Sequence, residues 1–337
     1  MDNKTAILFL GDVVPYKPFK FRNSYKTVIN LECPIIKEGY PVRGKINLRV
    51  KGNYLKNIFG TNLLCTSLGN NHILDYGKEG LESTIMELEK LNINWFGINE
   101  RSNDEYHPLI MEFNKLRIAL FSIVCPSTSP VIEIDNLAHL SLLEVDKIIE
   151  RVTKIRKSVQ RIIIYLHWGI EESSYPSKEN ILVARKLVEA GVDIVIGSHA
   201  HAPQPIEKYK GGIIAYNLGN FIMPELKNIP TFFNELNKPQ SSYSKSLMIW
   251  NRVSWGLIIN MVSMDYYVKK YVFFFNKIIE LPFTPLDKYL KLSININNET
   301  YEHMVKKHLK KRALARRAKN FLSKPHIPNK IKRILWK

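Results

Sequence analysis

Six short polar clusters carry the side chains of this sequence that could do chemistry, and each follows an apolar run. They are Gly11-Asp12, Asn30-Leu31-Glu32, Gly69-Asn70-Asn71-His72, His167-Trp168-Gly169, Gly197-Ser198-His199-Ala200-His201 and Asn217-Leu218-Gly219-Asn220-Phe221. The apolar runs predict strands, and the carboxyl ends of strands in an open α/β sheet lie along one edge, where ligands bind. We therefore expect one pocket to hold Asp12, Glu32, Asn71, His72, His167, His199 and His201.

Two carboxylates, an amide oxygen and several imidazoles together predict a metal centre. These groups suit two divalent ions of intermediate hardness, such as Mn²⁺, Fe²⁺ or Zn²⁺. Two such ions about 3.5–4 Å apart share bridging groups and stabilise both the attacking and the leaving oxygen of a displacement. Hydrolysis is the reaction class that this arrangement favours.

Each cluster taken alone also has a purely structural explanation. Gly11-Asp12 could be a turn, Glu32 a solvated strand end, and His167 a hydrogen-bonded core histidine. The pair His199 and His201 is harder to explain this way, because alternate residues on a short loop can present two imidazoles to one centre. The coincidence of four of the nine histidines with both carboxylates at strand ends favours the metal site.

The elements that must position these groups alternate between short β-rich runs and helical patterns, which predicts an α/β fold with βαβ units. We expect strands over residues 5–10, 27–31, 63–67, 93–97, 116–123, 161–167, 193–197 and 213–217, and helices over residues 78–91, 141–158 and 178–190. The second helix carries a candidate capping box, with Ser141 as its N-cap and Glu144 three residues later.

The pattern changes after Phe221. Residues 224–245 are rich in Pro, Asn and Ser and predict a long loop or an inserted flap, whereas residues 255–275 predict a β-hairpin turning at Met264-Asp265. A helical pattern begins near residue 299. We therefore divide the chain into a domain over residues 1–298, with its motif core over 6–221, and a helical tail over 299–337.

The composition is that of a folded protein without a membrane-spanning helix. The chain has 337 residues, of which 45% are hydrophobic and 11% aromatic, enough for a large packed core. The longest apolar stretches, residues 253–262 and 272–275, fall short of the roughly 18 residues that a spanning helix needs. The first residues do not resemble a secretory leader, so we expect a cytoplasmic protein. Three widely spaced cysteines predict neither a disulfide framework nor a zinc ribbon.

The net charge of +18 is concentrated in the tail. Residues 303–337 hold thirteen Lys or Arg residues and no acid, which leaves 36 basic and 31 acidic residues in the first 302. Apolar residues recur among these cations at helical spacing, so a basic amphipathic helix on the inner face of an anionic membrane is one interpretation, and a solvated tail is the other. Nucleic acid is disfavoured as a partner because no recognised binding motif accompanies the charge.

The order of the six clusters, with Asp75-Tyr76-Gly77 after the third and Glu171 after the fourth, resembles the CapA family of bacterial capsule and poly-γ-glutamate synthesis proteins. That family looks like a branch of the calcineurin-like metallophosphoesterase superfamily. The resemblance implies a four-layer α/β/β/α sandwich. It also implies a hydrolase of extracellular polymer metabolism, whose metal-activated hydroxide attacks a phosphoester or a γ-glutamyl amide, and an anionic polymer as the partner.

The resemblance also implies a role for each motif residue. Asp12 and His201 would bind the first metal, Asn71, His167 and His199 the second, and Glu32 would bridge them. His72 would be the general acid, oriented by Asp75. Glu171, Asn217 and Asn70 would contact the substrate or the metal ligands.

Two departures from the superfamily pattern keep a second function open. Val14 stands where a histidine ligand is usual, and the bridging carboxylate is Glu32 in place of an aspartate. With one ligand fewer, the first ion could be loosely held or absent. The alternative is a non-catalytic accessory component of a polymer-synthesis complex that retains a partial metal site.

Overall fold

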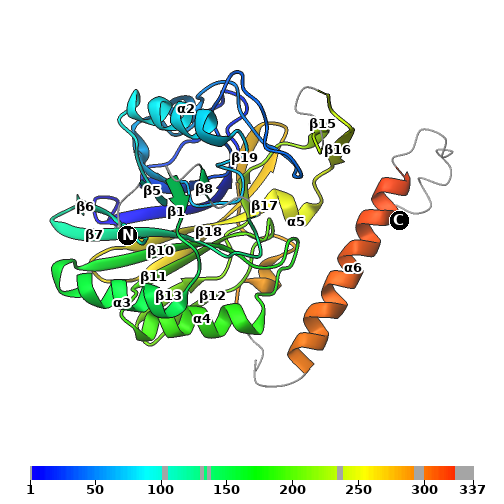
Figure 1. Ribbon diagram of the computed structural model, residues 1–337. Helices are drawn as coiled ribbons and strands as arrows, with labels where there is room; N and C mark the ends of the chain where they lie inside the picture. Colours follow the sequence, from blue (N-terminus) through cyan, green and yellow to red (C-terminus); the bar gives the residue numbers. More distant parts are fainter. Residues whose placement is uncertain are drawn as a thin grey trace. The chain divides into compact units, whose positions relative to one another are not determined.

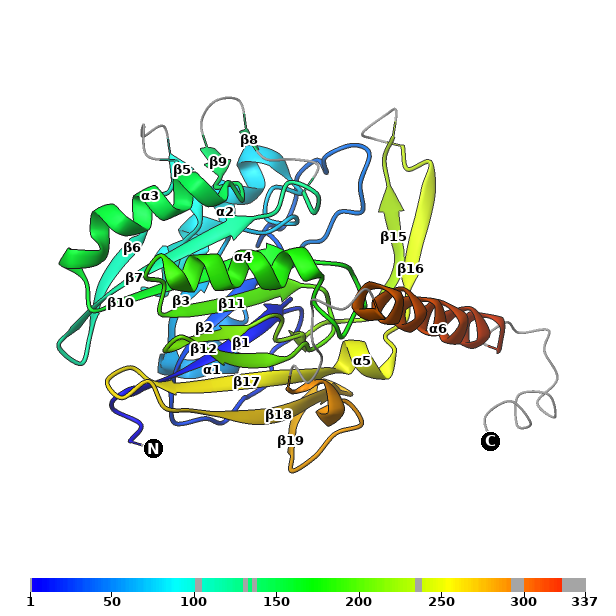
Figure 2. The same ribbon diagram turned by 90° about the horizontal axis from the view of Figure 1, so that it is seen from below.

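The computed structural model describes residues 2–100, 105–129, 133–134, 138–233, 238–291 and 300–322. The chain divides into two compact units, residues 1–292 and residues 293–337. The first unit contains all six polar clusters and is built around two large β-sheets (Figures 1 and 2).

The first sheet has eight strands, and parallel strands at its centre carry the N-terminal clusters. Its order is β19-β18-β17-β1-β2-β3-β4, and β14 pairs with β1. The strands β1 to β4 and β14 run parallel, whereas β17, β18 and β19 are antiparallel. The bounds are β1 Ala6–Val13, β2 Lys26–Leu31, β3 Leu63–Ser67, β4 Asn94–Phe96, β14 Asn220–Ile222, β17 Val253–Asn260, β18 Tyr266–Phe274 and β19 Lys277–Leu281.

The second sheet has six strands and carries the histidine clusters. Its order is β12-β13-β11-β10-β7-β6, with antiparallel strands β12 and β6 at the two edges of a parallel centre. The bounds are β6 Leu109–Phe113, β7 Leu116–Val124, β10 Arg161–Trp168, β11 Ile194–His199, β12 Ile206–Tyr209 and β13 Gly212–Ala215.

Two faces of apolar side chains hold the layers together. Ile7 and Phe9 of β1 pack with Ile163 and Tyr165 of β10 in the core between the sheets. The other face of the first sheet packs against helices α1 (Leu55–Phe59) and α2 (Gly77–Glu89). Helices α3 (Val145–Ile155) and α4 (Lys178–Glu189) lie outside the second sheet (Figure 1). This is the expected four-layer α/β/β/α arrangement. Each fully buried Leu, Ile or Val side chain in it contributes roughly 1.5–3 kcal/mol to the stability of the folded state.

The predicted capping box is wrong. Helix α3 begins four residues later than Ser141, and its N-cap is Glu144, whose side chain makes no capping bond. The Ser141 hydroxyl instead donates to the Glu105 carbonyl at 2.7 Å and lies 2.7 Å from Asn99 Nδ2, which donates to it. The buried Ser141 therefore stabilises the segment before the helix, and three residues separate it from Val145, the first residue of α3.

Within residues 224–245, the described residues form two paired strands where a loop or flap was predicted. Strands β15 (Leu226–Thr231) and β16 (Ser241–Lys245) pair antiparallel. The predicted β17–β18 hairpin is present, and its connection runs over residues 261–265. Shorter elements complete the unit: β5 Ile98–Glu100, β8 Glu133–Ile134, β9 Ala138–Leu140, α5 Ile249–Arg252, and the 3₁₀ turns Gly60–Asn62, Arg156–Ser158 and Asp287–Tyr289.

The second unit is described through one helix, α6, which spans Thr300–Leu322. It carries the basic residues of the tail up to Lys319, and the remaining tail residues 323–337 lie outside the described part of the chain. Within the described ranges, no helix combines the length and the apolar character that crossing a membrane requires.

The close approach of β1 to the turn at Gly219 gives the first prediction. A Cβ at Gly11 would lie 2.0 Å from the Gly219 carbonyl oxygen, so Gly11→Ala forces the backbone apart and is expected to cost about 3 kcal/mol or more. Urea unfolding measures this cost. Gly211→Ala is the control: its Cβ would meet no atom within 4 Å, and only its left-handed φ of +87° costs about 1–2 kcal/mol. Equal losses in the two variants would contradict the prediction.

Candidate metal centre

The carboxyl ends of β1, β2, β10 and β11 bring the predicted ligands to one place. Asp12 near the end of β1 pairs in register with Asn30 of β2 and with Asn220 of β14. On the second sheet, Trp168 of β10 pairs with His199 of β11. Since β1 and β11 also pack against each other, residues from both sheets meet at this edge.

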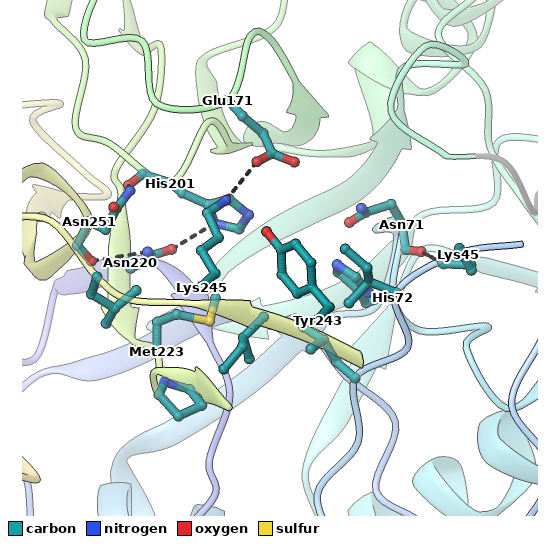
Figure 3. Close-up of a pocket in the computed structure, with 15 residues that line it drawn as sticks. Lys45, Asn71, His72, Glu171, His201, Asn220, Met223, Tyr243, Lys245 and Asn251 are labelled. Atoms are coloured by element: carbon teal, nitrogen blue, oxygen red, sulfur yellow. Dashed lines mark hydrogen bonds and ion pairs between the residues drawn. The ribbon is translucent and has the colours of Figure 1, made fainter. Parts of the chain in front are cut away.

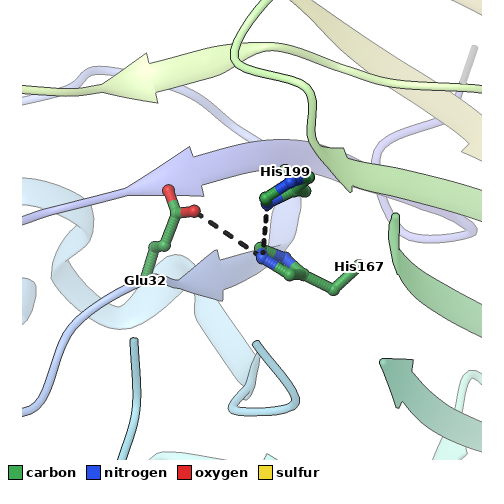
Figure 4. A group of neighbouring side chains, drawn as sticks. All are labelled: Glu32, His167 and His199. Atoms are coloured by element: carbon green, nitrogen blue, oxygen red, sulfur yellow. Dashed lines mark hydrogen bonds and ion pairs between the residues drawn. The ribbon is translucent and has the colours of Figure 1, made fainter. Parts of the chain in front are cut away.

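Two ligand groups share Glu32. Glu32, His167 and His199 form one group, and Asp12, Glu32 and His201 form the other. Within each group the ligand atoms all lie within 4.8 Å of one another. Figure 4 shows the first group, with His167 between Glu32 and His199. The two groups therefore have Glu32 in common, and each contains at least one imidazole.

The individual distances show how tightly the groups converge. His167 Nε2 lies 3.9 Å from Glu32 Oε1, 3.2 Å from His199 Nδ1 and 2.8 Å from Asn71 Oδ1. His201 Nδ1 lies 3.8 Å from Glu32 Oε2 and 3.5 Å from Asp12 Oδ2. The Asn71 amide oxygen therefore lies beside the group of His167 and His199.

The Glu32 carboxylate is the strongest indication that the cluster suits cations. Glu32 is fully buried, and neither of its oxygens has a hydrogen-bond partner in the described structure. A buried carboxylate without partners is costly, and a cation between it and the imidazoles would remove that cost. Carboxylate oxygen and imidazole nitrogen are also the donor types that Mn²⁺, Fe²⁺ and Zn²⁺ accept. The residues present therefore fit a pair of divalent ions.

In the metal-free cluster, only some of the candidate ligands have the protonation state that metal binding needs. Burial lowers the pKa of His167 well below its usual value and, with the neighbouring His201, lowers that of His199 to about 4. Both imidazoles are therefore neutral at pH 7. Burial and Asp12 raise the pKa of Glu32. Although burial opposes it, Glu32 and Asp12 raise the pKa of His201 to about 10, so metal binding at this group would displace protons.

The loop that carries His199 and His201 is held in an uncommon backbone conformation. Both residues have a positive φ, 85° for His199 and 53° for His201. Such conformations are disfavoured for non-glycine residues and persist only where surrounding contacts fix them. Here the Ala200 carbonyl accepts from the Glu172 amide at 2.7 Å, and the His201 carbonyl accepts from Asn251 Nδ2 at 3.1 Å. The resulting turn directs both imidazoles toward Glu32.

His72 lines the pocket beside the cluster, and its ring is held by a carboxylate. Its Nδ1 lies 2.7 Å from Asp75 Oδ2, so the buried Asp75 fixes the orientation of the ring. Asp75 also forms an ion pair with Lys45, which donates to the Asn71 carbonyl as well. His72 lines the same pocket as Asn71 and His201, with its side chain 13% exposed.

The three remaining predicted residues have different surroundings. Glu171 lines the pocket and pairs with Lys245 at 2.8 Å; despite partial burial, His201 and Lys245 lower its pKa to about 2. Asn217 Oδ1 accepts from the Gly219 amide, and Asn70 Oδ1 accepts from the amides of His72 and Ile73. The contacts of Asn217 and Asn70 are thus those of residues that shape the loops around the ligands.

Sequence reasoning missed Lys45, Tyr243 and Lys245, which all line the pocket. Lys45 precedes a strand-like run without any motif, and the other two lie in the segment interpreted as a loop. Asn220 was visible in the sixth cluster, and its Oδ1 lies 2.8 Å from His201 Nδ1. Val14, at the position of the missing histidine ligand, is buried in the apolar core.

Comparisons with known proteins show the family of this chain. The family model for "Bacterial capsule synthesis protein PGA_cap" matches residues 12–225, a range that includes all the predicted site residues. The capsule biosynthesis protein CapA of Bacillus anthracis is 27% identical over 221 residues, which are 63% of this chain and 53% of that protein. The PGA biosynthesis protein CapA of Bacillus subtilis (strain 168) is 27% identical over 208 residues, 61% of this chain and 55% of that protein.

The chain spans about half the length of these curated relatives. Among solved structures, a putative 5'-nucleotidase from Staphylococcus aureus in complex with alpha-ketoglutarate is 14% identical, with a TM-score of 0.43. That match covers 90% of this chain and 58% of the other.

Glu32 gives a prediction for the metal-free protein. Because the pKa of Glu32 is raised in the folded protein, the folded state still holds this proton above about pH 4.3, where the unfolded chain releases it. The free energy of unfolding therefore falls as the pH rises through this range. Glu32→Gln removes this cost. We expect it to raise the free energy of unfolding at pH 7 in EDTA, and to have no effect near pH 4.

Urea unfolding of both proteins between pH 4 and 8 measures this difference. With saturating Mn²⁺ or Zn²⁺ the order should reverse, because the variant lacks the shared ligand. Glu112→Gln, at an exposed position on β6, is the matched control and should change neither series. A variant that is less stable than the parent in EDTA at pH 7 would contradict the prediction.

The two ligand groups give a prediction for metal content. Elemental analysis of the protein after dialysis against Mn²⁺ or Zn²⁺ should find two ions per chain. His199→Ala and His201→Ala should each lose one ion, because each removes a ligand from only one group. Loss of both ions in either single variant, or of neither, would contradict a pair of separate sites.

Proposed function

Because this chain belongs to the PGA_cap family of bacterial capsule synthesis proteins, we propose that it is a metal-dependent hydrolase of capsule or extracellular polymer metabolism. The observation that carries the proposal is the buried Glu32 carboxylate, which has no hydrogen bond to its oxygens in the described structure and is shared by two groups of candidate ligands. A structural glutamate in a dry interior would have hydrogen-bond partners, whereas a bridging ligand needs its oxygens free for cations.

When bound, two divalent ions would polarise the scissile group and lower the pKa of a water molecule. Asp12, Glu32 and His201 would hold one ion, and Glu32, Asn71, His167 and His199 the other. We propose Mn²⁺, Fe²⁺ or Zn²⁺ as the metal, since all three accept this mixture of oxygen and nitrogen donors.

The protein groups around this centre account for the rest of the chemistry. His72 donates a proton to the leaving group from its Nε2, because its Nδ1 is engaged by Asp75. Asp75 keeps the ring oriented and stabilises its positive charge before the proton leaves. The reaction is hydrolysis of a phosphoester or a γ-glutamyl amide, the bonds that the family's connection with capsules and poly-γ-glutamate suggests.

A second candidate is a non-catalytic accessory role in a polymer-synthesis complex. Val14 favours it: an apolar, buried side chain stands where the superfamily pattern has a further ligand, so the group of Asp12, Glu32 and His201 offers one donor fewer. An accessory protein would bind metal without turning over substrate. Polymer production in cells would then survive His72→Ala.

The basic tail supports an anionic partner in either case. Residues 303–337 carry thirteen cations and no acid, and the described part of this segment is helical. We propose that it attracts the anionic polymer or an anionic membrane surface, each cation near such a surface contributing about 1 kcal/mol.

The general-acid role gives a prediction on leaving groups. His72→Ala should lower kcat by about 10²–10⁴ for phenyl phosphate, whose leaving group needs a proton, and much less for p-nitrophenyl phosphate, whose leaving group does not. Metal content should not change. Steady-state kinetics with Mn²⁺ measures both losses.

Two controls accompany the kinetic series. His107→Ala changes an exposed histidine that does not line the pocket and should leave both rates unchanged. EDTA should abolish turnover of both esters. Equal losses for the two esters in His72→Ala would exclude His72 as the proton donor, and absence of metal-dependent turnover with either ester, and with a γ-glutamyl anilide, would favour the accessory role.

A further inference from the structure

A pocket of about 200 Å³ opens beside the candidate metal centre (Figure 3). Its walls include Lys45, Ile46 and Leu48 on one side and Leu226, Tyr243 and Lys245 of the β15–β16 hairpin on the other. The two walls are joined by a hydrogen bond of 2.8 Å from the Gly44 amide to the Phe232 carbonyl. His72, Asn71 and His201 line the same pocket, so a molecule in it would contact both the proposed acid and metal ligands.

The cations of the pocket are already paired with carboxylates. Lys45 forms its ion pair with Asp75. Lys245 lies 2.8 Å from Glu171 and 3.6 Å from Glu172. The side chains of both lysines are mostly buried, 8% and 18% exposed, so these pairs are poorly screened by solvent. A second or third anionic group of a substrate would have to compete with these carboxylates.

The amides of the pocket are engaged as well. Asn220 Oδ1 lies 2.8 Å from His201 Nδ1, and Asn220 Nδ2 donates to the Asn251 carbonyl at 3.0 Å. Asn251 Nδ2 in turn donates to the His201 carbonyl. These two amides therefore hold the His201 turn in place and offer little hydrogen bonding to a ligand.

Apolar side chains supply the remaining walls. Ile46 and Leu48 line one side, and Met223, Leu226 and Leu247 line the other. They surround a ring, that of Tyr243, which Figure 3 shows pointing into the pocket between His201 and His72. The Tyr243 hydroxyl has no hydrogen-bond partner among the residues that the structure describes. An aromatic face with a free hydroxyl, enclosed by aliphatic groups, suits an aromatic or aliphatic group attached to one polar function.

We infer that this pocket binds the apolar or aromatic substituent of an amphiphilic substrate, whose single reacting anionic or acyl group lies at the metal centre. Tyr243 and Leu226, both on the hairpin, determine the specificity. The inference rests on the proposed hydrolytic function and narrows it: the group next to the scissile bond is apolar, and a run of carboxylates is excluded from the pocket.

Binding of two phosphonates tests the inference without turnover. Phenylphosphonate and methylphosphonate carry the same anionic head and differ only in the apolar substituent. Calorimetry on the Mn²⁺-loaded full-length protein should show phenylphosphonate binding at least about tenfold more tightly, as burial of a phenyl ring predicts. Tyr243→Ala and Leu226→Ala should each reduce this ratio to about three or less.

Two further variants and one further ligand make the test specific. Tyr243→Phe keeps the ring and should keep most of the preference, whereas Leu182→Ala, on the exposed face of α4, should keep all of it. Manganese affinity, measured in each variant, shows that the fold and the centre are intact. Equal affinities for the two phosphonates, or tighter and salt-sensitive binding of a short γ-linked oligoglutamate in the pocket, would overturn the inference.

Failure of the proposed function would look different. A protein that prefers phenylphosphonate but hydrolyses neither phosphoesters nor γ-glutamyl amides has the pocket and lacks the activity. A protein that hydrolyses phosphoesters but binds the two phosphonates with equal affinity has the activity, and the assignment of the pocket is then wrong.

Discussion

The structure depends on one unfavourable feature, a carboxylate buried without hydrogen bonds where two sheets meet. Glu32 lies 3.9 Å from one imidazole and 3.8 Å from another, close enough for cations between them and too far for hydrogen bonds. Surrounding groups must hold this geometry against the tendency of a buried charge to take up a proton or reach water. The hydrogen-bonded loops around Asp12, Asn71 and His201 hold this geometry. Many polar side chains here therefore bond to the backbone of these loops and do not point at the candidate metal centre.

The same constraint explains the tight backbone contacts nearby. Asp12 reaches the centre because Gly11 lets β1 pass against the Gly219 carbonyl, and His199 does so because Gly197 lets β11 pass against the Tyr216 carbonyl. A Cβ at Gly197 would lie 1.8 Å from that oxygen. Glycine is therefore required in two clusters because the connection between β13 and β14 passes close to both strands, and this requirement serves the ligands indirectly.

Features that are set by neighbouring residues in the sequence could be predicted, whereas features that are set by distant contacts could not. The parallel strands and the convergence of Asp12, Glu32 and the histidines were predictable because each ligand directly follows an apolar run of regular length. The β15–β16 hairpin was not, since its strands contain exposed polar residues and a proline and resemble a loop. The N-cap at Ser141 was misassigned for a similar reason: a tertiary hydrogen bond to Glu105 competes with the local capping pattern.

The distribution of charge separates attraction from recognition in this protein. Most of the net positive charge lies in residues 303–337, whereas Lys45 and Lys245 beside the candidate metal centre are paired with Asp75, Glu171 and Glu172. Long-range attraction of a polyanion needs an excess of positive charge, and most of this excess lies in the sequence of the tail. Discrimination at the reacting bond needs a shaped pocket, because paired charges in a poorly screened site give little further affinity to another anion. A substrate that is anionic overall and apolar next to its reacting bond would satisfy both regions at once.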